Sequence, residues 1–489
     1  TPTWVPLVGV GIVSLVILGV MRPDLIFSAN TPAGGDMGAH VLGPAFLRDQ
    51  LLPSGQILGW SNSWFAGFPI FYFYFPLPSL VIVLFDLVMP YGVAFKLVTV
   101  MGLLATPPAA YFLARSIGMN RAVATVAGAA GGSFVFIESF TIYGANIAST
   151  LAGEFSFSWS FALALVYFGL LTRGLRDDPG LLPVAALLLG LTALSHIIVT
   201  IVVVLATLPM LVWRRAAGRV VFTWIAGFLV AGFWALPLLA RFGLTADMAW
   251  SPLNDWDELF PIEIWPIVPL AVAGMIWAVR KTVRAVPVVG MTLIPFIYFW
   301  LPVAFAEDPW KLWNGRLLPF WFFGLTFFAG IAVGVLMTSL ARRLPRRVPL
   351  WQPVVAIVVV ALLFAAGAGF GRPGNPGVAL MVAGGVALAA LGFMVFAVQI
   401  RTTIALVLAV SIGFVSAAGL GIAFLSGWAT WNYSGYEGKA PWPEYEALME
   451  TIDTLPDGRI QWEVDSDYLD QYGTSMSLML FPYWSDGHP

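Results

Sequence analysis

The chain has 489 residues, of which 59% are hydrophobic and only 10% are charged, with a net charge of −2. Soluble domains carry about 25% charged residues, and apolar runs of about 20 residues, long enough to cross a bilayer as helices, recur along this chain. The absence of cysteine excludes disulfides and thiolate ligands, and three histidines argue against a histidine-rich metal site. The composition therefore predicts an all-α polytopic membrane protein.

The apolar runs predict about 13 transmembrane helices. Their expected ranges are 4–21, 94–114, 122–140, 154–172, 180–197, 198–213, 219–240, 261–279, 285–304, 317–339, 350–370, 377–399 and 403–426. If the N-terminus is cytoplasmic, most basic residues fall in short loops on that side. These residues are Arg115, Arg121, Arg173, Arg176, Arg214, Arg215, Arg219, Arg280, Lys281, Arg284, Arg342, Arg343, Arg346, Arg347 and Arg401. Because positive charge in short loops marks the cytoplasmic face, we expect a multi-pass plasma-membrane protein with an extracytoplasmic C-terminal segment.

One apolar stretch, Phe68–Pro90, is left out of this count. Counting it as a span would invert every later loop and place the arginine clusters outside. Its run FPIFYFYFPLP, rich in aromatic residues and proline, suits a re-entrant or interfacial helix in a long first external loop, 22–93. The transmembrane domain then covers 1–426, and 427–489 is an external segment that could begin a soluble domain.

The loop Thr31–His40, TPAGGDMGAH, brings an acid and a histidine together after the first apolar run. Asp36 and His40 are four residues apart, so both point the same way if Asp36 begins a short helix. A carboxylate at the boundary of water and lipid can act as general base for a sugar hydroxyl or bind a cation. The alternative is a helix N-cap, which Gly-Gly-Asp before MGAH also favours.

Two more polar residues are predicted at the outer ends of membrane helices. Glu154 opens a helix in LAGEFSFS, where an acid suits the positive end of the helix dipole, yet an ionisable group at that depth also indicates function. His196 lies in LTALSHII, where a lone histidine can be a packing or hydrogen-bonding group. Because Asp36 is expected on the same face, both remain candidate site residues.

Arg316 follows Trp313 and Asn314 in WNGRLLPFW, directly before a membrane helix. A planar guanidinium held there can bond two oxygens of a phosphate, and the alternative is a side chain that snorkels to the interface. Trp313 and the first-loop residues Trp64 and Tyr72 could stack on sugar rings, although an interfacial aromatic belt explains them equally well. No basic patch is predicted on the outer face, so nucleic acid is not expected as a partner.

The order of these features resembles the GT-C superfamily of membrane glycosyltransferases, which use polyprenyl-phosphate-linked sugars. Its members have a first helix running outward, a long external loop with an early Asp, and many further spans. Six segments are similar to those of actinobacterial membrane proteins labelled as related to 6-pyruvoyl-tetrahydropterin synthase, namely GGDMGAH, YFYFPLPSL, LAGEFSFS, LSH, WNGRLLPFW and YGTSMSLMLFPYW. Mycobacterial arabinofuranosyltransferases of the cell wall have a similar architecture.

The resemblance implies transfer of a sugar from a polyprenyl-phosphate donor, drawn from the membrane, to a cell-envelope glycan or glycolipid acceptor at the outer face. Asp36 is then the base or metal-binding acid, and Arg316 with His196 stabilises the leaving phosphate. Gly35 stands where many members carry a second acid, so Glu154 is expected to supply it. Mg²⁺ or Mn²⁺ is compatible with this site but not required, with Asp36 as the candidate ligand. A transporter or flippase of a lipid-linked sugar, and a non-catalytic assembly subunit, remain alternatives.

Overall fold

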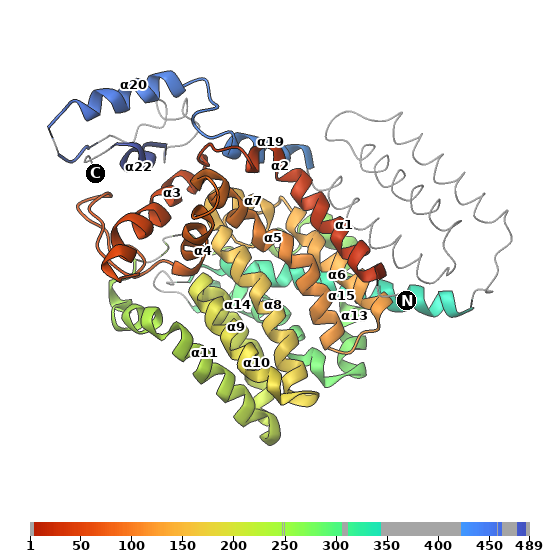
Figure 1. Cartoon of the computed structure of the whole chain (residues 1–489). Coiled ribbons are helices and arrows are strands. Elements are labelled where there is room, and N and C mark those ends of the chain that lie inside the picture. Colours follow the sequence, from red (N-terminus) through yellow and green to blue (C-terminus); the bar gives the residue numbers. More distant parts are fainter. Residues whose placement is uncertain are drawn as a thin grey trace, which may run out of the picture.

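The computed structural model describes residues 4–246, 248, 250–305, 312–343, 422–456, 458–461 and 477–485. In these ranges the regular elements are helices, and β-type pairing is confined to an isolated bridge between Ser61 and Phe68. The long helices form a bundle, with α20 (Trp442–Asp453) and α22 (Phe481–Trp484) over one end of it (Figure 1). The predicted helices 350–370, 377–399 and 403–426 lie outside the described residues.

The bundle helices follow the predicted order. They are α1 (Trp4–Val20), α5 (Tyr91–Ser116), α6 (Arg121–Ser133), α8 (Phe155–Arg176), α9 (Leu182–Ser195), α10 (Ile197–Thr207), α11 (Arg214–Ala240), α13 (Val268–Lys281), α14 (Val286–Phe305) and α15 (Leu318–Arg343). Within the described ranges, 5 segments are long and apolar enough to cross a membrane, and several other helices are apolar but shorter. The predicted fold class, an all-α multi-pass membrane protein, is confirmed, whereas the count of 13 spans stays a prediction.

Helices α8 and α15 form the centre of the bundle. α8 packs along α5 and α9, and α15 packs along α6 and α13. Glycines allow the closest approaches: a Cβ on Gly102 of α5 would lie 2.5 Å from the Ser158 backbone of α8, and one on Gly330 of α15 would lie 2.9 Å from Ala127 Cα of α6. Small residues at such crossings let membrane helices gain van der Waals contact where lipid offers no hydrophobic driving force.

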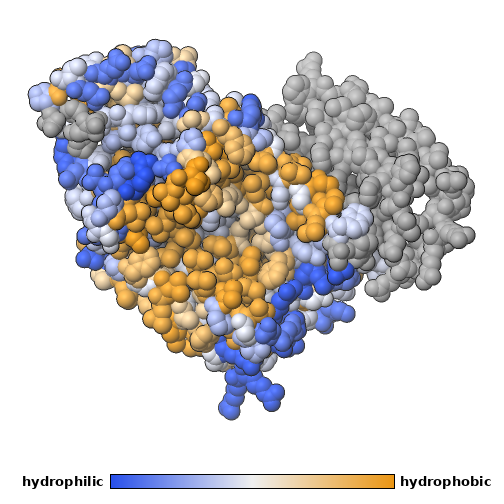
Figure 2. Space-filling model, viewed as in Figure 1, coloured by the Kyte–Doolittle hydropathy of each residue, from blue (hydrophilic) through white to orange (hydrophobic). Residues whose placement is uncertain are grey.

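Basic residues meet at one end of the bundle. Arg284, between α13 and α14, pairs with Asp177 after α8 at 2.5 Å, and Arg219 of α11 donates a hydrogen bond to the Leu175 carbonyl at 3.0 Å. A broad band of hydrophobic residues covers the visible face between hydrophilic regions at its upper left and lower ends (Figure 2). The loops expected on one side of the membrane therefore lie together, and their cytoplasmic location stays a prediction.

The first loop contains α2 (Pro23–Ile26), α3 (Met37–Phe46) and α4 (Pro76–Asp86). At 11 residues, α4 is only about 16 Å long, roughly half the hydrocarbon thickness of a bilayer. It packs against α3, α5 and α9. The apolar stretch Phe68–Pro90 thus contains a short helix, in agreement with its interpretation as a re-entrant or interfacial segment.

The C-terminal segment packs on the first loop. The segment begins in α19 (Ile422–Tyr433), which contacts α1 and α2. Leu480 packs against Gly38 of α3, and the Tyr483 ring stacks on Tyr91 with centroids 5.5 Å apart. The described part of 427–489 is therefore attached to the helix that follows Asp36.

Several predicted helix boundaries differ from the structure; α11, for example, begins at Arg214 instead of at 219. The expected helix 122–140 ends as α6 at Ser133 with a 3-10 turn to Phe136, because the Asn146 amide then satisfies the carbonyls of Ile137 and Phe140 at 2.6 and 2.9 Å. The expected helix 261–279 begins as a 3-10 turn, Ile262–Ile267, before α13.

Candidate active site

A glycine turn places Asp36. Gly34 and Gly35 have φ angles of +94° and +53°, which favour glycine. A Cβ on Gly34 would collide with the Asn432 side chain, and one on Gly35 would lie 2.9 Å from the Ala152 carbonyl oxygen. The Asp36 backbone N–H donates to the same Ala152 oxygen at 3.0 Å. The turn is thus fixed to the chain just before Glu154.

Asp36 stands at the N-cap position of α3, but its side chain forms no capping hydrogen bond. Asp36 is exposed. Its backbone carbonyl accepts a hydrogen bond at 3.2 Å from the backbone N–H of His40, which lies one helical turn further along α3. The carboxylate therefore does not cap the helix, which was the alternative considered from the sequence. The group remains open to a ligand.

A π-helical turn, Thr150–Glu154, leads into α8 and carries Glu154 to the same place. Gly153 within it has φ +124°, and a Cβ there would lie 2.9 Å from Asp36 Cβ and 3.4 Å from His40 Cδ2. π-Turns within helices are frequent at functional sites. Here the turn and its glycine let α3 and the start of α8 approach closely.

Glu154, Arg316 and His196 form a cluster beside this turn. Arg316 Nη2 lies 2.5 Å from Glu154 Oε1, and His196 Nε2 lies 4.0 Å from Glu154 Oε2. The three side chains are 13% (Arg316), 19% (Glu154) and 5% (His196) exposed. Arg316 Nε and Nη1 and His196 Nδ1 are buried and have no hydrogen-bond partner among the described residues. The guanidinium is therefore engaged by protein on one side only, and the other side can bond an anion.

His196 lies at the break between α9 and α10, in extended backbone. Its ring packs between Phe75, at a centroid distance of 4.3 Å, and Phe157, at 4.7 Å. His196 therefore has both roles: it packs against aromatic rings, as considered from the sequence, and it belongs to the cluster with Glu154. The aromatic contacts hold the imidazole edge beside Glu154.

Tyr74 belongs to the site although sequence analysis favoured Tyr72 of the same aromatic run. Tyr74 Oη lies 3.4 Å from His40 Nε2, and Trp234 of α11 donates to the Tyr74 carbonyl at 3.0 Å. Burial raises the pKa of Tyr74, and the nearby charge of Glu154 raises it further, so the phenol stays protonated. Tyr72 instead lies beneath the Arg241 guanidinium, 5.4 Å from its ring centroid. The alternating run FYFYF gives no signal that separates the two tyrosines.

The surroundings raise the pKa of the acid in the first loop and lower the pKa of the histidine. Partial desolvation of the carboxylate raises the pKa of Asp36, even though the residue as a whole is exposed, and the charge of Arg316 opposes this effect. Burial lowers the pKa of His40 to about 4, although Glu154 acts against it. His40 is therefore neutral near pH 7 and can hydrogen-bond through either ring nitrogen.

The other predicted residues form contacts of their own. The Asn314 amide binds Leu253 N at 2.9 Å and the Leu253 and Phe299 carbonyls at 2.8 and 2.9 Å, so it braces a loop. Trp313 Nε1 donates to the Ser251 carbonyl at 3.0 Å. Trp64 packs edge-on against Phe68. In the described part of the chain, these hydrogen bonds and ring contacts go to residues other than Glu154 and Arg316.

The described residues of the site offer few ligands for a cation. Among the described residues, no group of three or more His, Asp and Glu side chains could hold a metal ion. Glu154 is engaged by Arg316, which leaves Asp36 as the single candidate ligand. Mg²⁺ or Mn²⁺ stays a prediction from the sequence, and no step below depends on it.

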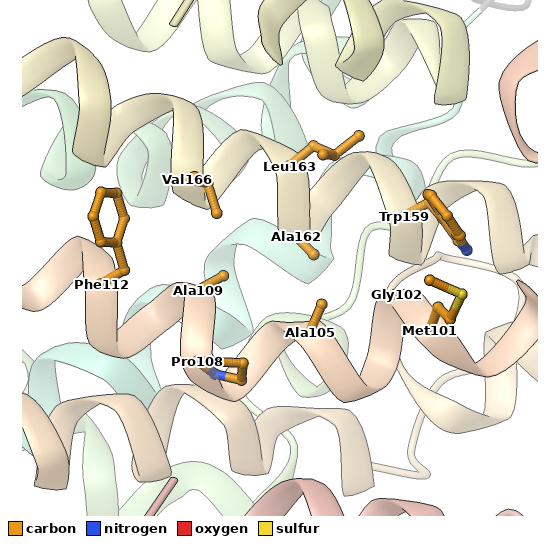
Figure 3. Close-up of a pocket in the computed structure, with 10 residues that line it drawn as sticks. All are labelled: Met101, Gly102, Ala105, Pro108, Ala109, Phe112, Trp159, Ala162, Leu163 and Val166. Atoms are coloured by element: carbon orange, nitrogen blue, oxygen red, sulfur yellow. The ribbon is translucent and has the colours of Figure 1, made fainter. Parts of the chain in front are cut away.

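An apolar groove runs along the bundle between α5 and α8, with a volume of about 350 Å³. Figure 3 shows side chains from the two helices facing one another across it. Its lining residues are Met101, Gly102, Ala105, Pro108, Ala109, Phe112, Trp159, Ala162, Leu163 and Val166. The groove is therefore almost entirely apolar, and both helices that line it are long and apolar enough to span a membrane.

No family model and no curated protein matches the chain. Among solved structures, ArnT from Cupriavidus metallidurans in the apo state is similar, with 14% identity, a TM-score of 0.52, and coverage of 96% of this chain and 83% of that one. ArnT bound to undecaprenyl phosphate gives 16% identity, a TM-score of 0.52, and coverage of 97% and 84%. The apo oligosaccharyltransferase of Archaeoglobus fulgidus gives 10% identity, a TM-score of 0.51, and coverage of 100% and 60%.

These likenesses concern the fold. They span nearly the whole of this chain. The more specific resemblance to actinobacterial proteins and arabinofuranosyltransferases stays a prediction. The chain therefore has a helical membrane fold similar to the folds of ArnT and the archaeal oligosaccharyltransferase.

Proposed function

We propose that this protein is a membrane glycosyltransferase that transfers a sugar from a polyprenyl-phosphate donor to a glycan or glycolipid acceptor of the cell envelope. The observation that carries the proposal is the half-engaged Arg316 guanidinium, paired with Glu154 on a turn that packs against the uncapped Asp36. One group suits a phosphate and the other suits a hydroxyl. Undecaprenyl phosphate bound to a structure of the same fold supports a donor of this lipid class.

Arg316 supplies the anion site. Its Nε and Nη1 donate to the donor phosphate while Glu154 holds Nη2. When the bond between the anomeric carbon and the phosphate oxygen breaks, the electron pair moves to the phosphate. Fixed donors aimed at that growing charge stabilise the transition state more than the ground state.

Asp36 acts on the acceptor. The acceptor oxygen forms the new bond to the anomeric carbon and gives its proton to the Asp36 carboxylate. A raised pKa makes this carboxylate a stronger base than an ordinary aspartate. Tyr74 and neutral His40 lie beside it and can orient the acceptor hydroxyl.

Glu154 takes a different role from the second acid that the resemblance implied. Its Oε1 is bonded to Arg316 and its Oε2 faces His196, so it orients the phosphate-binding group. We therefore assign Glu154 as a positioning residue. The site as a whole is placed on the extracytoplasmic side, on the positive-inside argument from the arginine loops.

The test is sugar transfer by purified protein in liposomes that contain a polyprenyl-phosphate sugar. Asp36→Asn keeps the size of the side chain and removes the base, so the rate should fall by about 10²–10⁴-fold. Asp49→Asn is the matched control, because Asp49 lies in the same loop, is exposed and pairs with Arg48. A fully active Asp36→Asn protein contradicts the catalytic role.

The alternative of a transporter or flippase gives a different result in the same liposomes. Such proteins bind substrate near the bilayer midplane, whereas the polar cluster here lies at the ends of α8 and α9. Movement of the lipid-linked sugar between leaflets, without any glycosylated product, would favour the transporter. A non-catalytic subunit would show neither activity.

A further inference from the structure

We infer that Asn432 is a positioning residue that sets the spacing between the Asp36 turn and the Glu154 turn. The inference rests on the function proposed above. Asn432 is in the last turn of α19, at the start of a stretch, Trp431–Lys439, that we call the bridging segment. Nothing in the pattern of apolar runs marks it, because it lies far along the chain from both acids.

Asn432 contacts both turns at once. Its backbone carbonyl accepts from Ala33 N at 2.8 Å, three residues before Asp36, and its Nδ2 donates to the Leu151 carbonyl at 2.6 Å, three residues before Glu154. The side chain is fully buried and lies directly against Gly34. A single residue thus joins the two loops that carry the acids.

The two turns also touch each other directly, through the hydrogen bond from Asp36 N to the Ala152 carbonyl. Together with the two bonds of Asn432, this bond closes a small ring of contacts. Loss of the Asn432 amide would open the ring on the Leu151 side. The distance from the Asp36 carboxylate to the Glu154–Arg316 pair would then vary.

The rest of the bridging segment keeps Asn432 in place. Lys439 Nζ donates to the Trp431 and Gly435 carbonyls, both at 2.7 Å, and lies 4.5 Å from the centre of the Trp431 ring. Thr31 N–H donates to Glu437 Oε1 at 3.2 Å, and the Asn30 amide donates to the Ser434 carbonyl at 2.7 Å. The segment is therefore a rigid support for the Asp36 turn.

A positioning role predicts a specific kinetic pattern. Asn432→Ala leaves Asp36, Glu154 and Arg316 chemically intact, so donor binding should be retained. Misplacement of a reacting group by about 1 Å costs on the order of 100-fold in rate. We expect kcat to fall by roughly 10- to 100-fold while KM for the donor and the affinity for undecaprenyl phosphate stay near the wild-type values. Ser434→Ala, which removes an exposed hydroxyl of the same segment, is the matched control.

A second measurement does not depend on catalysis. The chain has no cysteine, so Ala152→Cys gives a single label site at the hydrogen bond between the turns. Maleimide should react faster with Cys at 152 when Asn432→Ala is added, and at an unchanged rate when Ser434→Ala is added. Asn432→Asp, equal in size but without the N–H donor, gives the same comparison if the alanine variant does not fold.

The outcomes separate the two ideas. The positioning role is overturned if Asn432→Ala or Asn432→Asp keeps the wild-type kcat. It is also overturned if Cys at 152 is labelled as slowly in the Asn432 variants as in the Ala152→Cys protein that keeps Asn432. A fall in kcat together with an equal rise in donor KM also overturns it, because that pattern indicates a damaged phosphate site. If the wild type transfers no sugar at all, the proposed function fails, and the labelling rates still decide whether Asn432 holds the turns together.

Discussion

Arg316→Lys probes the phosphate site with the smallest change of charge. Lysine keeps a positive charge beside Glu154 but lacks Nε and Nη1, the two buried donors that have no partner among the described residues. A hydrogen bond to a charged group contributes about 1.5–3 kcal/mol. A lysine ammonium can replace one of the two donors, so a net loss of about 2 kcal/mol is expected, which is roughly 30-fold in affinity for the lipid phosphate.

The assay is equilibrium binding of undecaprenyl phosphate to the protein in nanodiscs, read by native mass spectrometry or a radiolabelled lipid. Arg241→Lys is the control, because Arg241 lies just after α11, is exposed, and faces Tyr72 instead of Glu154. Arg316→Ala should weaken binding further, since it also leaves the Glu154 carboxylate without its cation. Binding by Arg316→Lys as tight as that of the wild type would refute the assignment of the phosphate site.

Three further predictions concern the walls of the site. Gly153→Ala adds a Cβ 2.9 Å from that of Asp36 at a φ of +124°, so it should cost about 1–3 kcal/mol of stability, seen as a lower Tm by tryptophan fluorescence; an unchanged Tm speaks against the close approach. Tyr74→Phe removes the hydroxyl beside His40 and should reduce kcat by several-fold, whereas Tyr72→Phe should not; equal effects would remove Tyr74 from the site. His40 has a folded-state pKa of about 4 against 6.5 in the unfolded chain, so its contribution to stability is full above pH 6.5 and is lost as the pH falls toward 4, by on the order of 3 kcal/mol. His40→Gln should flatten that part of the profile of Tm against pH, and a profile as steep as that of the wild type contradicts the shift.

Much of the fold could be predicted because it depends on short-range features of the sequence. Apolar runs fix where α5, α8 and α15 lie, because a span needs a certain length of apolar helix. The arginine loops predict which helix ends meet, as the Arg284–Asp177 pair illustrates. Helix ends are harder to predict because they depend on residues further along the chain. The helical segment that contains α6 ends near Phe136, where Asn146, ten residues later, donates hydrogen bonds to the Ile137 and Phe140 carbonyls.

The site could be predicted only in part. Asp36, Glu154, His196 and Arg316 stand out because each is a polar group at the end of an apolar run, and the structure brings them together. Asn314 stands out for the same reason, yet its amide is used within the protein. Composition marks a polar side chain but does not tell whether its hydrogen bonds are already formed. That question is answered only by the partners, which come from distant parts of the chain.

The long sequence distance between Asn432 and the Asp36 turn has a consequence for biosynthesis. A membrane protein is inserted helix by helix as it is made, and Leu151 lies 281 residues before Asn432, its hydrogen-bond partner. The Glu154–Arg316 pair can form once the ribosome has passed residue 316, but the turn that carries Asp36 gains its buried support only after α19 is synthesised. In a nascent chain the anion site can therefore form before Asn432 supports the Asp36 turn.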